Sequence, residues 1–344
     1  MKQSVFLHCD LKTGIVLVLI LTSLTACRNL AIEQTDEAMG QGAEQAIIHQ
    51  TPFFKLSLAQ WSMHRMILQG EIDPYQFAAK AKTWGFEGLE YVSALYKSEL
   101  EPAGYSAEAM QGFVSRCNAE AAKYGLENLL IMVDGEGNLA TPDAVARSQA
   151  IANHYKWVDA ARAMGCHSIR VNLWGSDDPA QWASASVDSL TRLCIYARHK
   201  DINVLVENHG GLSSNARMLA GVIQEVGMAN CGTLPDFGNF CMRKNDPEDW
   251  GSGCAKMYDR YKGVKELMPY ARAVSAKSYN FDAQGDETEI DFTRMLSLIK
   301  AAGYTGYIGV EYEGNVLKEE AGILATRDLL LNIEGLWDRP FQYP

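Results

Sequence analysis

The chain has 344 residues, of which 47% are hydrophobic, and this is enough to bury one large core or two smaller ones. Its formal net charge of -11 argues against a nucleic-acid partner, because binding to a phosphate backbone requires a basic surface. The composition therefore predicts an acidic globular protein whose ligand is neither DNA nor RNA.

The first 26 residues have the pattern of an export signal. Lys2 and Lys12 precede the apolar run at residues 15–21, which is too short to span a membrane and suits the hydrophobic part of a signal peptide. The sequence Leu-Thr-Ala-Cys that ends at Cys27 resembles the bacterial lipobox, in which the cysteine is lipidated and becomes the new N-terminus. We therefore expect residues 1–26 to be a signal peptide, and Cys27 to anchor an exported protein to a bacterial membrane, on the periplasmic side or at the cell surface. The alternative is a plain secretory leader with a coincidental cysteine.

Residues 27–52 are predicted to be the lipidated cysteine and a flexible tether, because they are polar and form no apolar face. Residues 53–344 are predicted to form a single domain. Its six cysteines include no CxxC pair, so neither a zinc site nor a disulfide framework is indicated. We expect most of them to be buried as small apolar residues. An exported location nevertheless permits bridges, and the candidates are Cys231, Cys241 and Cys254.

Strand-like and helix-like segments alternate from residue 53 to the end of the chain. The apolar patterns predict eight strands, near residues 54–61, 86–92, 128–133, 167–174, 202–209, 231–237, 272–279 and 306–312. Helix-like segments follow these strands at residues 73–84, 107–124, 142–164, 179–199, 214–225, 258–268, 291–302 and 318–333. Eight strand–helix pairs predict an α/β fold of the (β/α)8 TIM barrel type. The alternative is a doubly wound open sheet, but no GxGxxG motif follows the first strand.

Four glycines mark the ends of predicted helices. Gly85, Gly125, Gly165 and Gly303 each stand directly after a helix-like segment and directly before a strand. Glycine is favoured there because a helix commonly ends with one residue in the left-handed conformation. These positions support the predicted alternation.

The C-terminal ends of the predicted strands carry the candidate site residues, since these ends form the working face of a TIM barrel. Glu207, Asp236 and Glu311 occupy equivalent places in the fifth, sixth and eighth strands. Three buried carboxylates repel one another unless a cation or a proton lies among them, so they predict a site for a divalent metal ion. The other polar residues at these ends are His64, Glu90, Asp134, Glu136, Asn172, His209, Lys277 and Glu313.

The motifs around the three carboxylates resemble those of the xylose-isomerase-like sugar phosphate isomerase/epimerase family. Glu207 lies in Val-Glu-Asn-His, Asp236 in Pro-Asp-Phe-Gly-Asn and Glu311 in Gly-Val-Glu-Tyr-Glu-Gly. The resemblance extends from about residue 56 to residue 330 and includes the segments at 85–90 and 303–307. It implies a site for Mn²⁺, Mg²⁺, Co²⁺ or Zn²⁺ built from two glutamates, an aspartate and a histidine. It also implies that Glu207 and Glu311 move a proton at a carbon next to a carbonyl, through an enediolate that the metal stabilises.

The sequence departs from the family pattern at one metal ligand. The family histidine belongs in the seventh strand, but Ser275 stands there, and no histidine follows His209 in the chain. The fourth ligand is then water, substrate or His209, which lies two residues after Glu207 and so on the same strand face. Lys277 shares the face of Ser275 and is predicted to replace part of the positive charge, by polarising a carbonyl or acting as an acid.

Four further residues are predicted to bind substrate: His64, Glu90, Asn172 and His209. Each has a structural alternative. His64 and Asn172 can cap loops, His209 can bond a loop carbonyl, and Glu90 can pair inside the barrel with an arginine such as Arg170. Glu313 is expected to face away from the metal at Glu311 or to contact a loop.

These features predict an exported, metal-dependent isomerase or epimerase whose partner is a small carbohydrate and which can form homo-oligomers. Export argues for a non-phosphorylated sugar or sugar derivative, since sugar phosphates are mainly cytoplasmic. A lyase or hydratase that expels a β-substituent from a keto-sugar or glycoside is the alternative enzyme, and the missing histidine favours it. A third alternative is a non-catalytic, carbohydrate-binding lipoprotein with a degenerate barrel.

Overall fold

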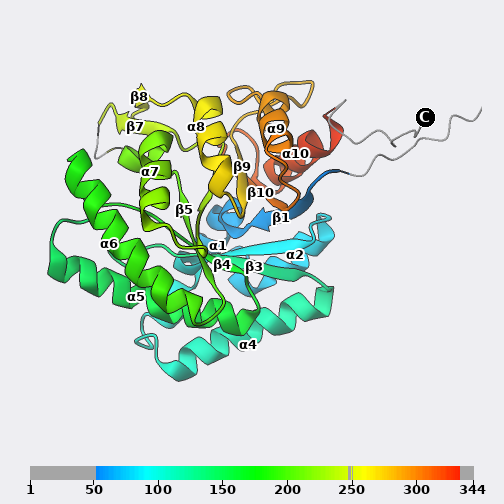
Figure 1. Cartoon of the computed structure of the whole chain (residues 1–344). Coiled ribbons are helices and arrows are strands. Elements are labelled where there is room, and N and C mark those ends of the chain that lie inside the picture. The colour runs from blue at the N-terminus through cyan, green and yellow to red at the C-terminus, as the bar shows by residue number, and fades with distance from the viewer. Residues whose placement is uncertain (1–51, 247–248, 250, 334–344) are drawn as a thin grey trace, which may run out of the picture. The chain divides into compact units, whose positions relative to one another are not determined.

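A sheet of eight parallel strands forms the centre of the protein (Figure 1). The computed structural model describes residues 52–246, 249 and 251–333. Neighbouring strands follow the order β6-β5-β4-β3-β2-β1-β10-β9. Their bounds are β1 (Lys55–Ala59), β2 (Gly88–Val92), β3 (Glu127–Met132), β4 (Ser168–Val171), β5 (Asn203–Glu207), β6 (Cys231–Leu234), β9 (Val274–Ser278) and β10 (Tyr307–Tyr312).

The sheet closes between its first and last strands. β6 and β9 are joined by parallel bridges that pair Thr233 with Ala271 and Asp236 with Ser275. Across this seam the Ser275 N–H donates to the Pro235 carbonyl at 2.9 Å, and the Phe237 N–H donates to the Ser275 carbonyl at 3.1 Å. The predicted (β/α)8 TIM barrel is therefore confirmed, and the open doubly wound sheet is excluded.

Helices surround the sheet at the places that the sequence predicts, with ends that differ by a few residues at most. Several of them begin at side chains that accept hydrogen bonds from free backbone N–H groups, as Ser106 does for α4 and Asp143 for α5. The predicted left-handed glycines are also found, with φ of 82° at Gly85, 65° at Gly125, 76° at Gly165 and 73° at Gly303. The longer helices are α2 (Phe77–Thr83), α4 (Ala107–Tyr124), α5 (Ala144–Met164), α6 (Pro179–Arg198), α7 (Ala216–Val226), α8 (Arg260–Leu267), α9 (Phe292–Ala301) and α10 (Glu319–Asn332).

Two short helices follow strand ends on the side of the barrel where the candidate residues lie. They are α1 (His64–Leu68), which follows β1, and α3 (Lys97–Leu100), which follows β2. A 3₁₀ turn at residues 60–63 leads from β1 into α1. These short elements were not predicted, because one or two turns of helix leave too few residues to show a period.

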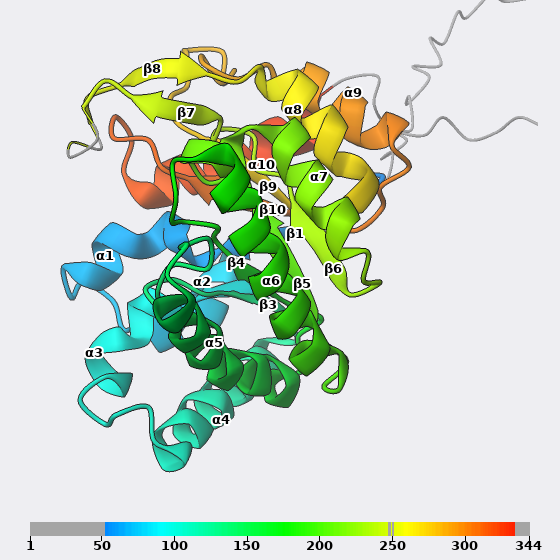
Figure 2. The ribbon, with the colours of Figure 1, turned by 60° about the vertical axis from the view of Figure 1, so that its left-hand side comes forward.

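A small antiparallel ribbon is inserted after β6, and Figure 2 shows it beside α8. Its strands are β7 (Cys241–Lys244) and β8 (Cys254–Met257). A disulfide joins Cys241 to Cys254, whose Cα atoms are 5.7 Å apart. The sequence did not predict this ribbon, although both cysteines were among the three candidates for a bridge. The third candidate, Cys231, is free and buried, as are Cys117, Cys166 and Cys194.

The predicted signal peptide, Cys27 and the tether lie outside the described residues, apart from the last residue of the tether. Within the described part of the chain, no helix combines the length and the apolar composition that crossing a membrane would require.

Candidate functional site

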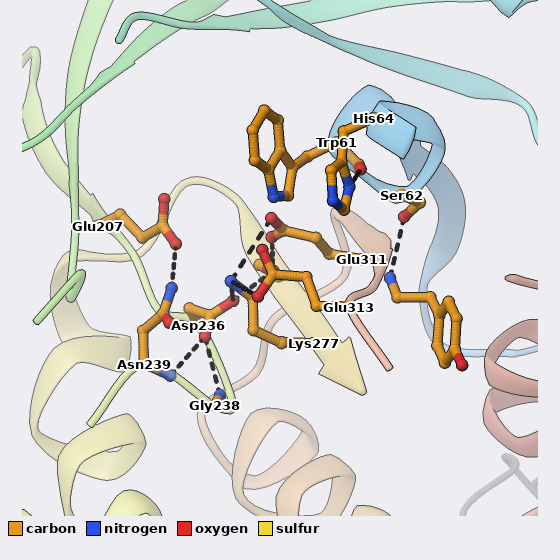
Figure 3. Close-up of polar contacts among 12 residues, drawn as sticks. Trp61, Ser62, His64, Glu207, Asp236, Gly238, Asn239, Lys277, Glu311 and Glu313 are labelled. Atoms are coloured by element: carbon orange, nitrogen blue, oxygen red, sulfur yellow. Dashed lines mark hydrogen bonds and ion pairs between the residues drawn. The ribbon is translucent and has the colours of Figure 1, made fainter. Parts of the chain in front are cut away.

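Three carboxylates meet at the C-terminal ends of the strands, as predicted. Glu207 is the last residue of β5, Asp236 follows β6 by two residues, and Glu311 lies near the end of β10. One oxygen from each lies within 4.8 Å of the other two, and the three residues are at most 4% exposed. Figure 3 shows Asp236 and Glu311 beside the Lys277 ammonium, and Glu207 joined to Asn239. The parallel strands bring them together because their carboxyl ends all open on one face of the barrel.

One part of this site, which we call the lysine side, consists of Asp236, Lys277, Glu311 and Glu313. The Lys277 ammonium lies 3.8 Å from Asp236 Oδ2, 3.5 Å from Glu311 Oε1 and 3.4 Å from Glu313 Oε2. Burial lowers the pKa of Lys277, but the three carboxylates outweigh burial and raise it well above its usual value. Lys277 is therefore a buried ammonium that three acids share.

Ser275 links two of these acids. Its Oγ lies 2.7 Å from Asp236 Oδ2 and 2.8 Å from Glu311 Oε2. A hydroxyl has one hydrogen to donate, so both contacts are favourable only when one of the two carboxyl groups is protonated or a cation lies nearby. Burial agrees with this, since it raises the pKa of Glu311 to about 8 and that of Asp236 to about 6, against the opposing effect of Lys277.

The other part, which we call the arginine side, consists of Asp134, Arg170 and Glu207. The Arg170 Nε lies 2.8 Å from Glu207 Oε2 in an ion pair whose angle is poor for a hydrogen bond, and a terminal nitrogen donates to Asp134 Oδ1 at 2.7 Å. Asn239 Nδ2 donates to the second oxygen of Glu207 at 2.9 Å. Burial raises the pKa of Asp134, but Arg170 and His209 outweigh it, and the net shift is downward.

The loop after β6 fixes the orientation of Asp236. Asn208 is fully buried and bonds both the N–H and the carbonyl of Asp236, at 2.8 and 3.0 Å. The N–H groups of Gly238 and Asn239 donate to Asp236 Oδ1 at 2.8 and 2.7 Å. Gly238 must be glycine, because a Cβ there would lie 2.4 Å from the hydroxyl of Tyr279. Only Oδ2 of Asp236 therefore remains directed at the site.

Glu90 lies inside the barrel and does not line the pocket beside the carboxylates. Ser57 Oγ donates to its Oε1 at 2.6 Å, and its Oε2 is buried without a hydrogen-bond partner. Gly309 leaves the room for this side chain, since a Cβ at that position would lie 2.5 Å from Glu90 Oε1. Burial raises the pKa of Glu90 to about 7. The ion pair with Arg170 that the sequence suggested for Glu90 is not formed, because Arg170 turns to Asp134 and Glu207.

A pocket of about 300 Å³ opens beside the arginine side. Two of its polar atoms, His209 Nδ1 and Asn172 Oδ1, are buried without a protein partner. The rings of Trp174 and His209 meet edge to face, with centroids 5.7 Å apart. Burial lowers the pKa of His209, which favours the neutral imidazole. Two predicted substrate ligands, Asn172 and His209, thus lie in one pocket, whose walls also include Asp134, Glu136 and His154.

His64, another predicted substrate ligand, lies across the site, near Glu311 and Glu313 (Figure 3). Its ring stacks on Trp61 with centroids 4.5 Å apart, and its side chain is 19% exposed. The turn that carries Trp61 and leads into His64 is attached to β10, because the Tyr312 N–H donates to Ser62 Oγ at 2.9 Å.

The expectation for Glu313 was wrong. Its carboxylate contacts Lys277 and so faces the same site as Glu311. Burial raises its pKa, but Lys277, His209 and His64 together lower it further. The alternation of side chains along a strand could have predicted this, since residues two apart point to the same face. Sequence reasoning gave Asn239 no role, although it ends the Pro-Asp-Phe-Gly-Asn motif, and it missed Glu319, which no local pattern connects to the site.

The carboxylate cluster fits a hard divalent cation. Five carboxylates face two cationic side chains across the two sides, which leaves negative charge that the described residues do not neutralise. The three donors within 4.8 Å of one another are all oxygens, and within the described residues no histidine nitrogen joins them. His209, the predicted fourth ligand, is therefore not part of this group. Oxygen donors favour Mg²⁺ or Mn²⁺ over Zn²⁺.

Comparison with known proteins agrees with this architecture. Residues 78–333 match the family model described as "Xylose isomerase-like TIM barrel". The structure is similar to that of D-allulose 3-epimerase from Methylomonas sp., with a TM-score of 0.60 and 13% identity over 82% of this chain and 99% of the other. It is also similar to a probable 3-DHS dehydratase from Bacillus anthracis, with a TM-score of 0.55 and 15% identity over 81% and 99% of the two chains.

One curated relative matches a shorter stretch. The 3'-dehydrocarminate deglycosidase alpha subunit of Microbacterium sp. is 34% identical over 68 residues, which are 20% of this chain. This chain thereby spans 16% of the length of that relative.

Proposed function

We propose that this chain, which belongs to the xylose isomerase-like TIM barrel family, is an enzyme that removes a proton from the carbon next to a carbonyl of a non-phosphorylated sugar or sugar derivative. Returning the proton to a neighbouring carbon, or to the opposite face of the same carbon, isomerises or epimerises the sugar. The convergence of Glu207, Asp236 and Glu311 within 4.8 Å carries the proposal.

The two glutamates have environments suited to different parts of a proton transfer. Glu207 lies 2.8 Å from Arg170, which orients it, and we assign it the role of base. Glu311 is hydrogen-bonded to Ser275 and lies 3.5 Å from the Lys277 ammonium, so it can return a proton from the other strand. Two carboxyl groups whose surroundings differ in this way are the usual arrangement for a base and an acid in one site.

A divalent cation held by Glu207, Asp236 and Glu311 would draw electron density from a carbonyl and its neighbouring hydroxyl. Lys277 is a side chain that can stabilise the same developing negative charge. Its ammonium is fixed by three carboxylates, so it offers a preorganised positive charge to an oxygen that becomes negative as the proton leaves.

The substrate is proposed to be uncharged. Asp134 and Glu136 line the pocket, and both cations of the site are already paired with carboxylates. Glu136 is itself paired with Lys156 at 2.6 Å, so among the described residues around the pocket a phosphate would find no cation that a carboxylate does not already hold. Hydroxyl groups suit the pocket better, because the polar side chains of Asn172 and His209 line it and Trp174 offers an aromatic face.

A second outcome of the same proton abstraction is elimination of a β-substituent from a keto-sugar or glycoside. Ser275 stands where the resemblance places a histidine ligand, and that loss favours this outcome over epimerisation. The likeness to a dehydratase and to a deglycosidase subunit is in line with it.

We also propose that the protein is exported and held at a membrane by a lipid on Cys27. The disulfide between Cys241 and Cys254 supports an oxidising location, where such bridges persist. Mass spectrometry of the N-terminal peptide and a Cys27→Ser variant test this. We expect acylated Cys27 in the parent and release of the variant from the membrane fraction, whereas an unmodified Cys27 would contradict the anchor.

Deuterium uptake tests the enzymatic proposal directly. The protein is incubated with Mn²⁺ in D₂O and with a panel of free and 3-keto sugars, and exchange at carbon is followed by NMR. We expect exchange of a hydrogen next to the carbonyl of at least one sugar. Binding of a sugar without any exchange would favour the non-catalytic, carbohydrate-binding alternative.

A further inference from the structure

His64 is held so that one ring nitrogen is committed to the protein and the other is not. Its Nδ1 lies 2.6 Å from the Trp61 carbonyl oxygen and 3.4 Å from Glu319 Oε1. A carbonyl and a carboxylate only accept hydrogen bonds, so Nδ1 carries the hydrogen. Nε2 is then the nitrogen that accepts or delivers a proton.

The surroundings of His64 are rigid. The ring lies nearly parallel to Trp61, with 8° between the planes, and Ser62 bonds the backbone of β10 on both sides of Glu311. Glu319, at the start of α10, is only 3% exposed in its side chain and accepts the N–H groups of Arg65 and Met66 at 2.8 and 2.9 Å. The same carboxylate thus caps α1 and stands behind His64.

Carboxylates lie on two sides of the His64 ring. Glu319 lies behind Nδ1, and Glu313 lies on the side of the active carboxylates. Arg65, whose Nε lies 3.5 Å from Glu319, opposes them but is directed by a hydrogen bond to the Gly314 carbonyl. An imidazolium in this place has negative charge on both sides.

We propose that His64 is the general acid that protonates a departing oxygen, and that Glu319 is a positioning residue that stabilises the imidazolium. The inference rests on the proposed function and selects elimination as its outcome. An epimerase with two carboxylates needs no further acid, whereas expulsion of an alkoxide from a keto-glycoside does, because an alkoxide is a poor leaving group until it is protonated.

The step balances without a co-reactant, since the substrate already contains the carbonyl. A carboxylate takes the hydrogen from the carbon next to the carbonyl, and its electron pair forms a double bond to the adjacent carbon. The bond from that carbon to the glycosidic oxygen breaks, and the oxygen takes the Nε2 proton of His64. The products are an alcohol and an unsaturated keto-sugar, and the carboxyl group returns the proton to His64 through solvent.

Two 3-keto glucosides that differ only in their leaving group test the role of His64. One releases methanol, which must be protonated, and the other releases 4-nitrophenol, which leaves as an anion. His64→Asn keeps a donor near Nδ1 for the Trp61 carbonyl but has no group at Nε2. We expect a loss of about 10²–10⁴-fold on the methyl glucoside and less than about tenfold on the nitrophenyl glucoside.

His199 provides a matched control, because it is exposed between α6 and the first residue of β5, at the opposite end of that strand from Glu207. His199→Asn should leave both rates unchanged. His64→Gln, which places an amide nearer to Nε2, serves as a second variant if His64→Asn does not fold. Equal losses on both glucosides, or no loss on either, would overturn the acid role.

The leaving group separates Glu319 as a positioning residue from a purely structural cap. Because Glu319 acts through His64, Glu319→Gln should slow release of methanol more than release of 4-nitrophenol, as His64→Asn does. An equal decrease on both glucosides would leave Glu319 only as a cap of α1. Deuterium uptake by the parent without release of either alcohol would overturn this inference while the proposed function stands, and absence of both would remove the proposed function as well.

Discussion

The two sides of the site neutralise their carboxylates in different ways. On the arginine side, one guanidinium takes Glu207 and Asp134 on separate nitrogens at 2.8 and 2.7 Å. On the lysine side, one ammonium is shared among three carboxylates at 3.4 to 3.8 Å. In the first arrangement, the planar Arg170 guanidinium holds each carboxylate in a fixed direction. In the second, the single charge of the Lys277 ammonium is surrounded by more carboxylates than it can neutralise.

This difference assigns a task to each side. The pKa of Asp134 is lowered overall, whereas burial raises those of Asp236 to about 6 and Glu311 to about 8. Asp236 and Glu311 on the lysine side are therefore suited to hold a proton or a cation, while Arg170 on the arginine side orients Glu207, the proposed base. Glu207 belongs to the arginine side by its ion pair and to the carboxylate cluster by its position, so it connects the two.

The largest expected effect comes from removing the acid of the lysine side. Glu311→Gln keeps the shape of the side chain but cannot exchange a proton, and we expect deuterium uptake by the substrate to fall by about 10²–10⁴-fold. Asp134→Asn is the matched change on the arginine side and should cost less than about tenfold. Equal losses in the two variants, measured by NMR in D₂O, would abolish the division of tasks.

Replacing the shared ammonium tests the charge excess. Lys277→Met leaves the buried Asp236 and Glu311 and the partly buried Glu313 without their cation, and we expect it to lower the free energy of unfolding by about 3–5 kcal/mol in the presence of a chelator. Mn²⁺ should restore much of this stability, because it binds only the folded site. In Arg170→Met, Mn²⁺ should restore less. Urea unfolding measures both, and a Lys277→Met protein as stable as its parent in chelator would contradict the account.

Glu90 shows what burial does to a carboxyl for which no ion pair is found within the described part of the chain. Its pKa in the folded protein is raised from 4.5 to about 7, so the stability that neutral Glu90 contributes is complete below pH 4.5 and is lost as the pH rises through 7. Glu90→Gln should match the parent near pH 4.5 and exceed it by about 3 kcal/mol near pH 9, at about 1.4 kcal/mol per pKa unit. If the free energy of unfolding of the two proteins changed in the same way with pH, burial would not raise the pKa of Glu90.

The smallest expected effect concerns the serine that bridges the lysine side. Ser275→Ala removes the hydroxyl between Asp236 and Glu311. We expect the free energy of unfolding to fall by about 1.5–3 kcal/mol, because hydrogen bonds to charged groups are stronger than those between neutral groups. Ser278→Ala is the control, since its Oγ bonds only the neutral Thr326 hydroxyl at 2.6 Å and should cost about 1 kcal/mol. A larger decrease in the free energy of unfolding for Ser278→Ala than for Ser275→Ala would contradict this expectation.

Much of the scaffold could be predicted because its signals are local and repeated. Apolar runs and left-handed glycines such as Gly125 recur in each strand–helix unit, and this repeated unit predicts the barrel. The carboxylate cluster could be predicted because strand ends of a parallel barrel open on one face, which places Glu207 beside Glu311 although 104 residues separate them in the sequence.

The rest depends on side-chain geometry between distant elements. The choice of Arg170 between Glu90 and Glu207 is made by the layer of the barrel in which each carboxylate lies, and no spacing encodes it. Glu319 reaches His64 from a helix 255 residues later in the chain. The ribbon closed by Cys241 and Cys254 has strands of four residues, too short for a period to appear.

Anomalous X-ray diffraction from crystals soaked in Mn²⁺ tests the central claim most directly. The account predicts one strong peak bounded by the carboxylates of Glu207, Asp236 and Glu311, with Lys277 still beside it. No peak at these three residues, with the ammonium alone between the acids, would contradict the claim that this cluster holds a divalent cation.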